Sequence, residues 1–114
     1  MEIPFEKIGD VTVARVPVDE LDASNAGEFK RGIAPLLQAS TKLVLDMGHL
    51  SFVDSSGLGA MLSCLRQLSG KNGDLKLCCM SKPVRSLFEL VRMHRIFDIY
   101  PTRQEALTAF QAQA

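Results

Sequence analysis

The sequence predicts an α/β domain, a mixed β-sheet of four to five strands with about four helices packed on it. Segments with strand and helix periodicity alternate along the chain in the order β-β-α-β-α-β-α-β-α. Such alternation is typical of parallel strands that are joined by covering helices. Two strand-like runs open the chain and predict a hairpin, which makes the sheet mixed. The length of 114 residues and the hydrophobic content of 46% predict a single domain over residues 1–114.

The opening hairpin is predicted from two runs, residues 3–8 and 11–18, which flank the pair Gly9 and Asp10. Glycine accepts a positive φ angle, which two-residue hairpin turns require. Pro17 has no N–H group to donate to a neighbouring strand. We therefore expect the second strand to end at Pro17 or to run there through an unpaired position.

The first helix is predicted to start at about Ser24 and to be interrupted by Pro35. A proline inside a helix removes one hydrogen bond and clashes with the preceding turn, so we expect a kink or an end near Ala34. The apolar side of this helix is expected to consist of Ala26, Phe29, Ile33, Leu36 and Leu37.

The middle of the chain predicts a buried strand over residues 42–47 and a second apolar run over residues 50–53 that returns toward the core. The helix that follows starts at the serine pair Ser55 and Ser56. Its apolar residues recur with helical spacing and predict the face that packs on the core. They are Leu58, Met61, Leu62, Leu65 and Leu68.

The last third predicts a strand over residues 74–80, a helix from about Ser81, a short strand over residues 96–99 and a final helix. The final helix is indicated by Thr102 and Glu105, which have the spacing of a capping box, in which each side chain accepts a hydrogen bond from the backbone N–H of the other residue.

Composition argues against several classes of partner. Thirteen basic and thirteen acidic residues give a net charge of zero, so no diffuse field attracts nucleic acid. No apolar stretch reaches the length of a membrane span, and we expect no direct membrane binding. The N-terminus lacks the pattern of a signal peptide, so we expect a cytoplasmic location.

The cysteines and histidines predict neither a disulfide nor a metal site. Cys64, Cys78 and Cys79 are odd in number, and each lies in an apolar segment, so we expect reduced core residues. His49 and His94 are far apart in the sequence, and neither has a nearby cysteine or histidine at metal-ligand spacing. We expect no cofactor and no metal.

The stretch from Asp54 to Gly59 is the most informative part of the chain, because two hydroxyls and two glycines lie between an apolar strand and an amphipathic helix. A helix N-terminus stabilises a carboxylate or a phosphate. The ordinary interpretation is that Asp54 or a serine caps the helix. The second serine and the glycines exceed what capping requires, and they indicate a surface that another backbone or an enzyme approaches closely.

Two catalytic interpretations fail. A serine hydrolase of the α/β type needs Gly-x-Ser-x-Gly, and Val53 and Asp54 stand where its first glycine would have to be. A phosphate-binding loop needs a glycine five positions before Gly70, where the sequence has Leu65. We therefore predict no catalytic residues and no enzymatic activity.

Three segments in the same order resemble the STAS domain family, specifically bacterial anti-sigma factor antagonists. Residues 50–59 resemble the family signature, residues 21–26 its acidic loop before the first helix, and residues 81–88 a later helix entry. One departure is Asp19, which stands where the family commonly has glycine. The resemblance implies the STAS-type fold, which agrees with the α/β order predicted above.

The resemblance also implies a protein that is itself a substrate. A serine in the position of Ser55 is phosphorylated by a partner that is both a serine protein kinase and an anti-sigma factor. The unphosphorylated antagonist binds this partner and releases its target, and a serine phosphatase reverses the modification. Ser56 is the alternative acceptor, or otherwise a cap. The residues expected to contact the partner are Asp22, Ser24, Asp54, Ser55, Ser56, Gly57 and Gly59.

An alternative is a STAS scaffold that is not phosphorylated, such as a subunit of a membrane transport complex. Those relatives commonly lack the acceptor serine. The presence of Asp54, Ser55 and Ser56 therefore favours the switch.

Overall fold

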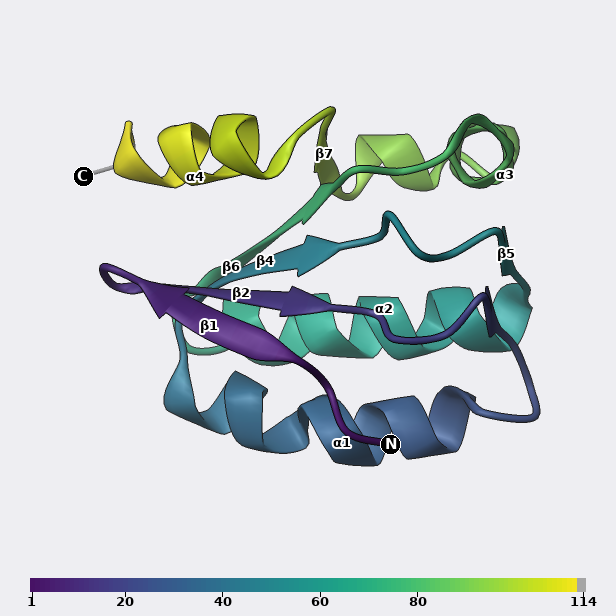
Figure 1. Cartoon of the computed structure of the whole chain (residues 1–114), viewed down its shortest axis with the longest axis horizontal. Coiled ribbons are helices and arrows are strands. Elements are labelled where there is room, and N and C mark those ends of the chain that lie inside the picture. Colours follow the sequence, from purple (N-terminus) through teal and green to yellow (C-terminus); the bar gives the residue numbers. More distant parts are fainter. Residues whose placement is uncertain (113–114) are drawn as a thin grey trace.

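The computed structural model describes residues 1–112 and contains a five-stranded mixed sheet in the order β1-β2-β4-β6-β7 (Figure 1). Only the β1–β2 pair is antiparallel among these neighbours, and the others are parallel. The predicted mixed sheet is confirmed. Its strands are β1 (Phe5–Ile8), β2 (Val11–Arg15), β4 (Lys42–Asp46), β6 (Asp74–Cys78) and β7 (Asp98–Tyr100).

A second, two-stranded parallel sheet joins β3 (Glu20–Leu21) and β5 (Phe52–Val53) at the end of the molecule where α2 begins (Figure 1). Strand β3 was not predicted from the sequence. Two-residue strands are too short to show a periodicity. Their pairing depends on contacts between segments about thirty residues apart, which a local pattern does not encode.

Four helices cover the sheet from both sides. In Figure 1, α1 and α2 lie below the sheet, and α3 and α4 lie above it. None of the helices within residues 1–112 is long and apolar enough to cross a membrane. The helices are α1 (Ala26–Ala39), α2 (Ser55–Ser69), α3 (Lys82–Leu90) and α4 (Arg103–Gln111), and a short 3₁₀ helix, η1 (Met93–Arg95), follows α3.

The sheet separates two hydrophobic cores. The larger core lies against α1 and α2 and extends to α3 through Val84 and Phe88. The smaller core lies under α4 and contains Val11, Val13, Val44, Cys78, Ala106, Leu107 and Phe110. Because strands β2, β4 and β6 are covered on both faces, their side chains are buried almost without alternation.

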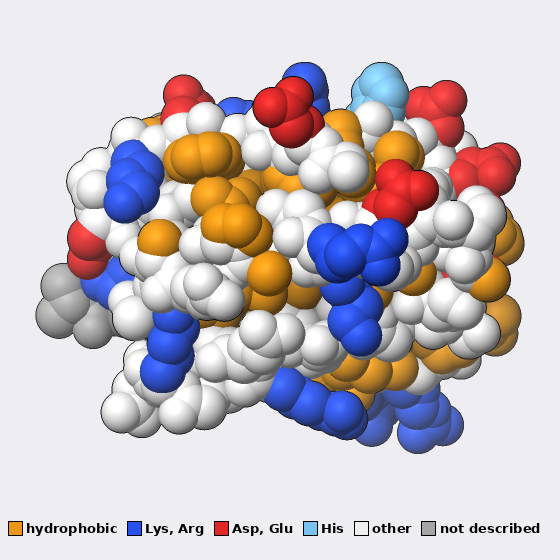
Figure 2. All heavy atoms as spheres, turned by 90° about the horizontal axis from the view of Figure 1, so that it is seen from below, with side chains coloured by type: hydrophobic (Ala, Val, Ile, Leu, Met, Phe, Trp, Pro, Cys, Tyr) orange, Lys and Arg blue, Asp and Glu red, His pale blue; other side chains and the backbone are white. Residues whose placement is uncertain are grey.

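Figure 2 shows the face that carries α1. Acidic side chains lie mainly toward the upper edge of this view and basic side chains mainly toward its lower edge, with exposed apolar side chains between them. The mixture matches the net charge of zero, and this face carries no continuous field of one sign.

The predicted hairpin is confirmed. Phe5 pairs with Ala14 and Ile8 with Val11, and Gly9 has a φ angle of 63°. Strand β2 ends at Arg15, two residues before Pro17. The missing N–H group of Pro17 therefore costs no ladder hydrogen bond.

The first helix does not end near Ala34, which was one of the two outcomes expected at Pro35. Helix α1 continues to Ala39 with Pro35 inside it, and it begins at Ala26 instead of Ser24. An interior proline costs about 3 kcal/mol. The expected apolar residues, two of which follow Pro35, are all buried in the larger core, and their burial offsets that cost. They are Ala26, Phe29, Ile33, Leu36 and Leu37.

The bounds of the last two strands and the buried face of α2 also differ from expectation. The last strand covers residues 98–100 instead of 96–99, and Ile96 is exposed. Strand β6 ends at Cys78, because Cys79 has a left-handed backbone with φ of 65°. The buried side of α2 consists of Gly57, Ala60, Met61, Cys64 and Leu68, and the expected Leu58, Leu62 and Leu65 are only partly buried against the core.

The three cysteines are free, as expected. Cys64 and Cys78 are buried, and burial raises the pKa of the Cys64 thiol to about 11. Cys79 is only partly buried, so its placement in the core was wrong. Its left-handed backbone turns the side chain out of the strand pattern.

Lys76 is a buried charged residue in the middle of β6. Its side chain is 1% exposed and forms ion pairs with Asp74 (3.1 Å) and Asp98 (3.0 Å). The ammonium also lies 4.8 Å from the centre of the Phe110 ring. Burial lowers the pKa of Lys76, but the hydrogen bonds to both carboxylates outweigh burial and leave this pKa raised. The contribution of the Lys76 charge is therefore present at neutral pH and is lost as pH rises through the raised pKa.

We predict that Lys76 stabilises the fold mainly through its buried stem. Lys76→Met keeps the stem, and Asp74 and Asp98 stay hydrated because their side chains are 35% and 54% exposed. The expected cost is below about 1.5 kcal/mol. Lys76→Ala leaves a cavity beneath Phe110 and should cost about 2–5 kcal/mol. Urea unfolding at pH 7 measures both values, and equal losses would show that the charge dominates.

Candidate functional site

Helix α2 begins directly after β5, and Asp54 is its cap. The Oδ1 atom of Asp54 accepts a hydrogen bond from the Gly57 N–H at 3.0 Å, and its backbone carbonyl accepts one from the Leu58 N–H at 2.9 Å. The expectation that Ser56 could cap the helix is therefore wrong. Asp54 has the extended backbone of an N-cap residue, which leaves Ser55 and Ser56 as the first two residues of the helix.

The same carboxylate joins two loops that are distant in the sequence. The Oδ2 atom of Asp54 accepts a hydrogen bond from the Ala23 N–H at 3.1 Å. The Asp54 N–H in turn donates to the Leu21 carbonyl at 3.2 Å. Asp54 thus holds the loop between β3 and α1 beside the N-terminus of α2. The two segments singled out in the sequence, residues 21–26 and 54–59, form one surface.

The loop between β3 and α1 is ordered by its own side chains. Asp22 Oδ1 accepts from both the backbone N–H (2.9 Å) and the hydroxyl (2.5 Å) of Ser24. Asn25 Oδ1 accepts from the Asp22 N–H at 2.9 Å, and its amide donates to the Glu20 carbonyl at 2.8 Å. The Ser24 hydroxyl lowers the pKa of Asp22, so this carboxylate remains charged at neutral pH. Ser24 positions Asp22 at the surface.

The two serine hydroxyls are available for chemistry. Ser55 and Ser56 are both exposed, and neither hydroxyl forms a hydrogen bond with any residue in the range 1–112. Their backbone N–H groups lie in the first helical turn, where no preceding carbonyl can accept from them. A phosphate on either oxygen would lie close to these N–H groups and to the positive end of the helix dipole.

The two glycines of the signature have different roles. A Cβ atom on Gly57 would lie 2.4 Å from the Leu21 carbonyl oxygen and 2.8 Å from Val53 Cγ1. Gly57 is buried, and the backbone that packs closely against it is that of Leu21 in the same chain, not that of a partner. A Cβ atom on exposed Gly59 would meet nothing within 4 Å. Gly57 therefore allows the two loops to pack, while Gly59 leaves a flat surface on the helix.

The residue that departs from the family pattern, Asp19, holds the loop between β4 and β5. Its carbonyl accepts hydrogen bonds from the N–H (2.7 Å) and the hydroxyl (3.0 Å) of Ser51. Its carboxylate lies 3.1 Å from His49 Nε2. This contact was not predicted from the sequence, because nothing in the spacing connects positions 19 and 49.

Phe52 is a further residue of this surface that the sequence analysis did not identify as functional. Its side chain is 43% exposed, and it lies on β5 two residues before the Asp54 cap. An exposed aromatic ring beside a polar loop is a common anchor of protein interfaces. Its position within residues 50–59, the segment that resembles the family signature, could have indicated this role.

Taken together, the site presents two exposed hydroxyls, and no residue within the described part of the chain is placed to activate either of them as a nucleophile. The Nε2 atom of His49, the nearer histidine in the sequence, lies 3.1 Å from the Asp19 carboxylate. No histidine, lysine or carboxylate of residues 1–112 bonds to the Ser55 or Ser56 hydroxyl. The geometry can accept a phosphoryl group from another protein, and the surrounding polar and aromatic surface can contact that protein.

Comparison with known proteins identifies relatives along nearly the whole chain. Residues 2–106 match the family described as the STAS domain. The chain is 29% identical over 112 residues to BtrV of Bordetella bronchiseptica, provisionally named an anti-sigma factor antagonist. That match covers 97% of this chain and 96% of BtrV.

Solved structures of anti-sigma factor antagonists also match nearly the whole chain. A protein of Thermotoga maritima, also provisionally named an anti-sigma factor antagonist, superposes with a TM-score of 0.86 at 28% identity, covering 94% of this chain and 92% of that one. The anti-sigma factor antagonist SpoIIAA in its unphosphorylated form has a TM-score of 0.69 at 25% identity, covering 96% and 97%. SpoIIAA of Bacillus has also been solved in a phosphorylated form.

We predict opposite effects for the two glycines. Gly57→Ala forces Leu21 or Val53 to move, so it should lower the free energy of unfolding by about 1–3 kcal/mol. Gly59→Ala adds no contact and removes backbone entropy from the unfolded chain, so it should raise this free energy by about 0.5–1 kcal/mol. Urea unfolding of both variants provides the comparison. Equal stability of the two variants would contradict the close approach at Gly57.

Proposed function

The chain belongs to the STAS domain family, and we propose that it acts as an anti-sigma factor antagonist that is switched by phosphorylation of Ser55. In its unphosphorylated form it binds an anti-sigma factor that is also a serine protein kinase, and the target of that factor is released. A serine phosphatase returns the modified protein to the binding form. The names of its relatives support the kind of partner.

The observation that carries the proposal is the position of Ser55. Its hydroxyl is exposed in the first residue of α2, directly after the cap Asp54. Ser55 also occupies the modified position of the family signature. Ser56 remains the alternative acceptor.

Phosphorylation should change binding and leave the fold intact. The phosphate adds about 1.5 to 2 negative charges. A negative charge at a helix N-terminus gains about 0.3–1 kcal/mol, so α2 tolerates it. In an interface the same group must lose its hydration, and Asp54 and Asp22 add like charge beside it. Such a contact can cost several kcal/mol.

The partner contacts the exposed part of this surface. Asp22, Ser24 and Asp54 provide acceptors, Ser55 and Ser56 provide hydroxyls, and Gly59 provides a flat helix surface. Buried Gly57 acts indirectly, by letting the Leu21 backbone pack beneath the site. Phe52 extends the surface with an apolar ring.

The function proposed is regulatory and not enzymatic, and its site of action is the cytoplasm, where sigma factors act. A STAS scaffold within a membrane transport complex is the alternative. The exposed Ser55 favours the switch, because a scaffold has no need for an acceptor hydroxyl at the helix N-terminus.

The test compares the same charge at the two ends of α2. Ser55→Asp should lower the affinity for the cognate anti-sigma kinase by at least about tenfold, which corresponds to 1.4 kcal/mol. The matched control is Ser69→Asp, at the exposed C-terminal end of α2 and about 21 Å away along the helix. It should bind as wild type does. Both variants should keep the circular dichroism spectrum and cooperative melting of wild type.

Affinity is measured by calorimetry at physiological salt, where distant charge effects are screened. The proposal fails if Ser55→Asp binds as tightly as Ser69→Asp, or if wild type copurifies with no kinase from its native cells.

A further inference from the structure

Asp46, Cys78 and Cys79 form a group of possible metal ligands at the carboxyl ends of two neighbouring strands. Asp46 ends β4 and pairs in register with Cys78, which ends β6. One carboxylate oxygen and both Sγ atoms lie within 4.8 Å of one another. Ligand atoms around one Zn²⁺ ion, at bond lengths of about 2.0–2.3 Å, lie up to about 3.8 Å apart. Small side-chain rotations therefore bring all three to one ion.

The backbone at Cys79 brings the two thiols to the same side of the sheet. Neighbouring residues of a strand point to opposite faces. Cys79 has a φ of 65°, which is rare for a residue with a side chain. As a result both Cys78 and Cys79 pack against the core beneath α4. Hydrogen bonds from the Met47 N–H to the Cys78 carbonyl (2.9 Å) and from the Cys79 N–H to the Tyr100 carbonyl (3.2 Å) hold this turn.

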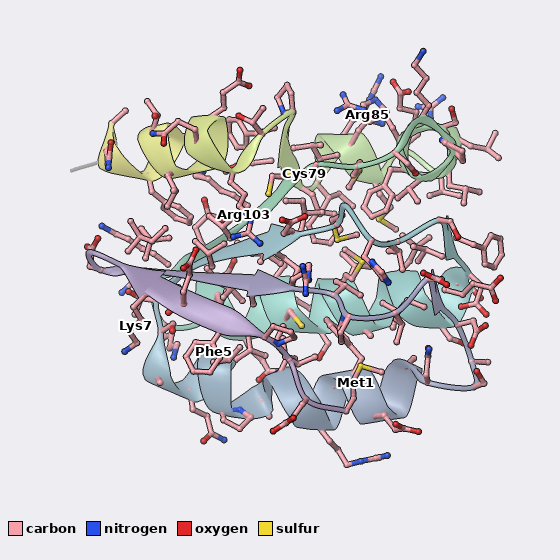
Figure 3. The ribbon with its side chains drawn as sticks, viewed as in Figure 1. Met1, Phe5, Lys7, Cys79, Arg85 and Arg103 are labelled. Carbon is pink, nitrogen blue, oxygen red and sulfur yellow. The ribbon has the colours of Figure 1, made fainter. Side chains whose placement is uncertain are left out.

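The third ligand, Asp46, is held in place from two sides. The Gly48 N–H donates to Asp46 Oδ1 at 2.8 Å, and Arg103 Nε donates to Asp46 Oδ2 at 2.6 Å. A Cβ atom on Gly48 would lie 3.0 Å from Asp46 Oδ1 and 3.5 Å from Cys79 Cβ, so a side chain there would crowd the group. Figure 3 shows Cys79 and Arg103 close together on the side of the sheet that carries α4.

We propose that Asp46, Cys78 and Cys79 bind one thiophilic divalent cation, of the class of Zn²⁺ or Cd²⁺. Two sulfur bonds and one oxygen bond form to the ion, and each thiol releases its proton to the buffer. The two thiolates, Asp46 and Arg103 then carry two negative charges in total, which the ion neutralises. Thiolate ligands select soft cations over Mg²⁺ or Ca²⁺. Access is from the side of Cys79, the one member of the group that is not buried.

Cd²⁺ is the probe for the test, because cadmium thiolates absorb in the ultraviolet by charge transfer. The untagged, reduced, full-length protein is titrated with Cd²⁺ alone. Wild type should develop this absorption and saturate at one ion per chain. Cys64→Ala is the matched control, because Cys64 is a buried thiol in the other core, and it should titrate as wild type does.

Two variants of Cys79 keep the test informative if one of them folds poorly. Cys79→Ser and Cys79→Gly should each lower the Cd²⁺ affinity at least about tenfold, since even loss of an outer-shell partner costs about 10–100-fold. Glycine also accepts the positive φ at this position. Circular dichroism verifies that each variant is folded. Absence of charge-transfer absorption in wild type, or an unchanged titration in both Cys79 variants, would overturn the proposal.

Discussion

The candidate site depends on one carboxylate, that of Asp54. One of its oxygens accepts from the first turn of α2, and the other accepts from the Ala23 N–H, 31 residues earlier in the chain. Hydrogen bonds to a charged acceptor are stronger than those between neutral groups. The same interaction therefore caps the helix, places Ser55 in its first position and aligns the loop that carries Asp22. Without it, the backbone hydrogen bond from the Asp54 N–H to the Leu21 carbonyl would be the remaining polar link between the two loops through this residue.

The strand order explains why the surface around Ser55 and the group of possible metal ligands lie at the same edge of the sheet. Strands β2, β4 and β6 are parallel, so their carboxyl ends meet at the same end of the sheet. Loops at this edge of an α/β sheet are common binding sites. Asp46 and Cys78 end two of these strands, and the loop after β4 leads through β5 to Ser55. The sheet thus positions both the surface around Ser55 and the group of Asp46, Cys78 and Cys79. The Ser55 hydroxyl itself lies beyond the loop that follows β4.

Short-range sequence signals predicted much of the fold. The remaining features depend on packing between segments that are distant in the sequence. The Gly9 turn and the Thr102 cap, which accepts from the Glu105 N–H at 3.1 Å, follow from short-range rules and were predicted correctly. Whether the helix continues through Pro35 was left open, because its stability comes from burial against distant segments. The cap was left open between Asp54 and a serine, since either side chain can accept from a first-turn N–H. The turn at Cys79 has no sequence signal, because its left-handed backbone is unusual for cysteine.

The most direct measurement of the central claim is the site of phosphorylation. The protein is incubated with its cognate kinase and ATP, and peptides of wild type, Ser55→Ala and Ser56→Ala are mapped by mass spectrometry. The account predicts phosphate on Ser55 in wild type and in Ser56→Ala, and none in Ser55→Ala. Phosphate on Ser56 in wild type, or full modification of Ser55→Ala, would contradict it.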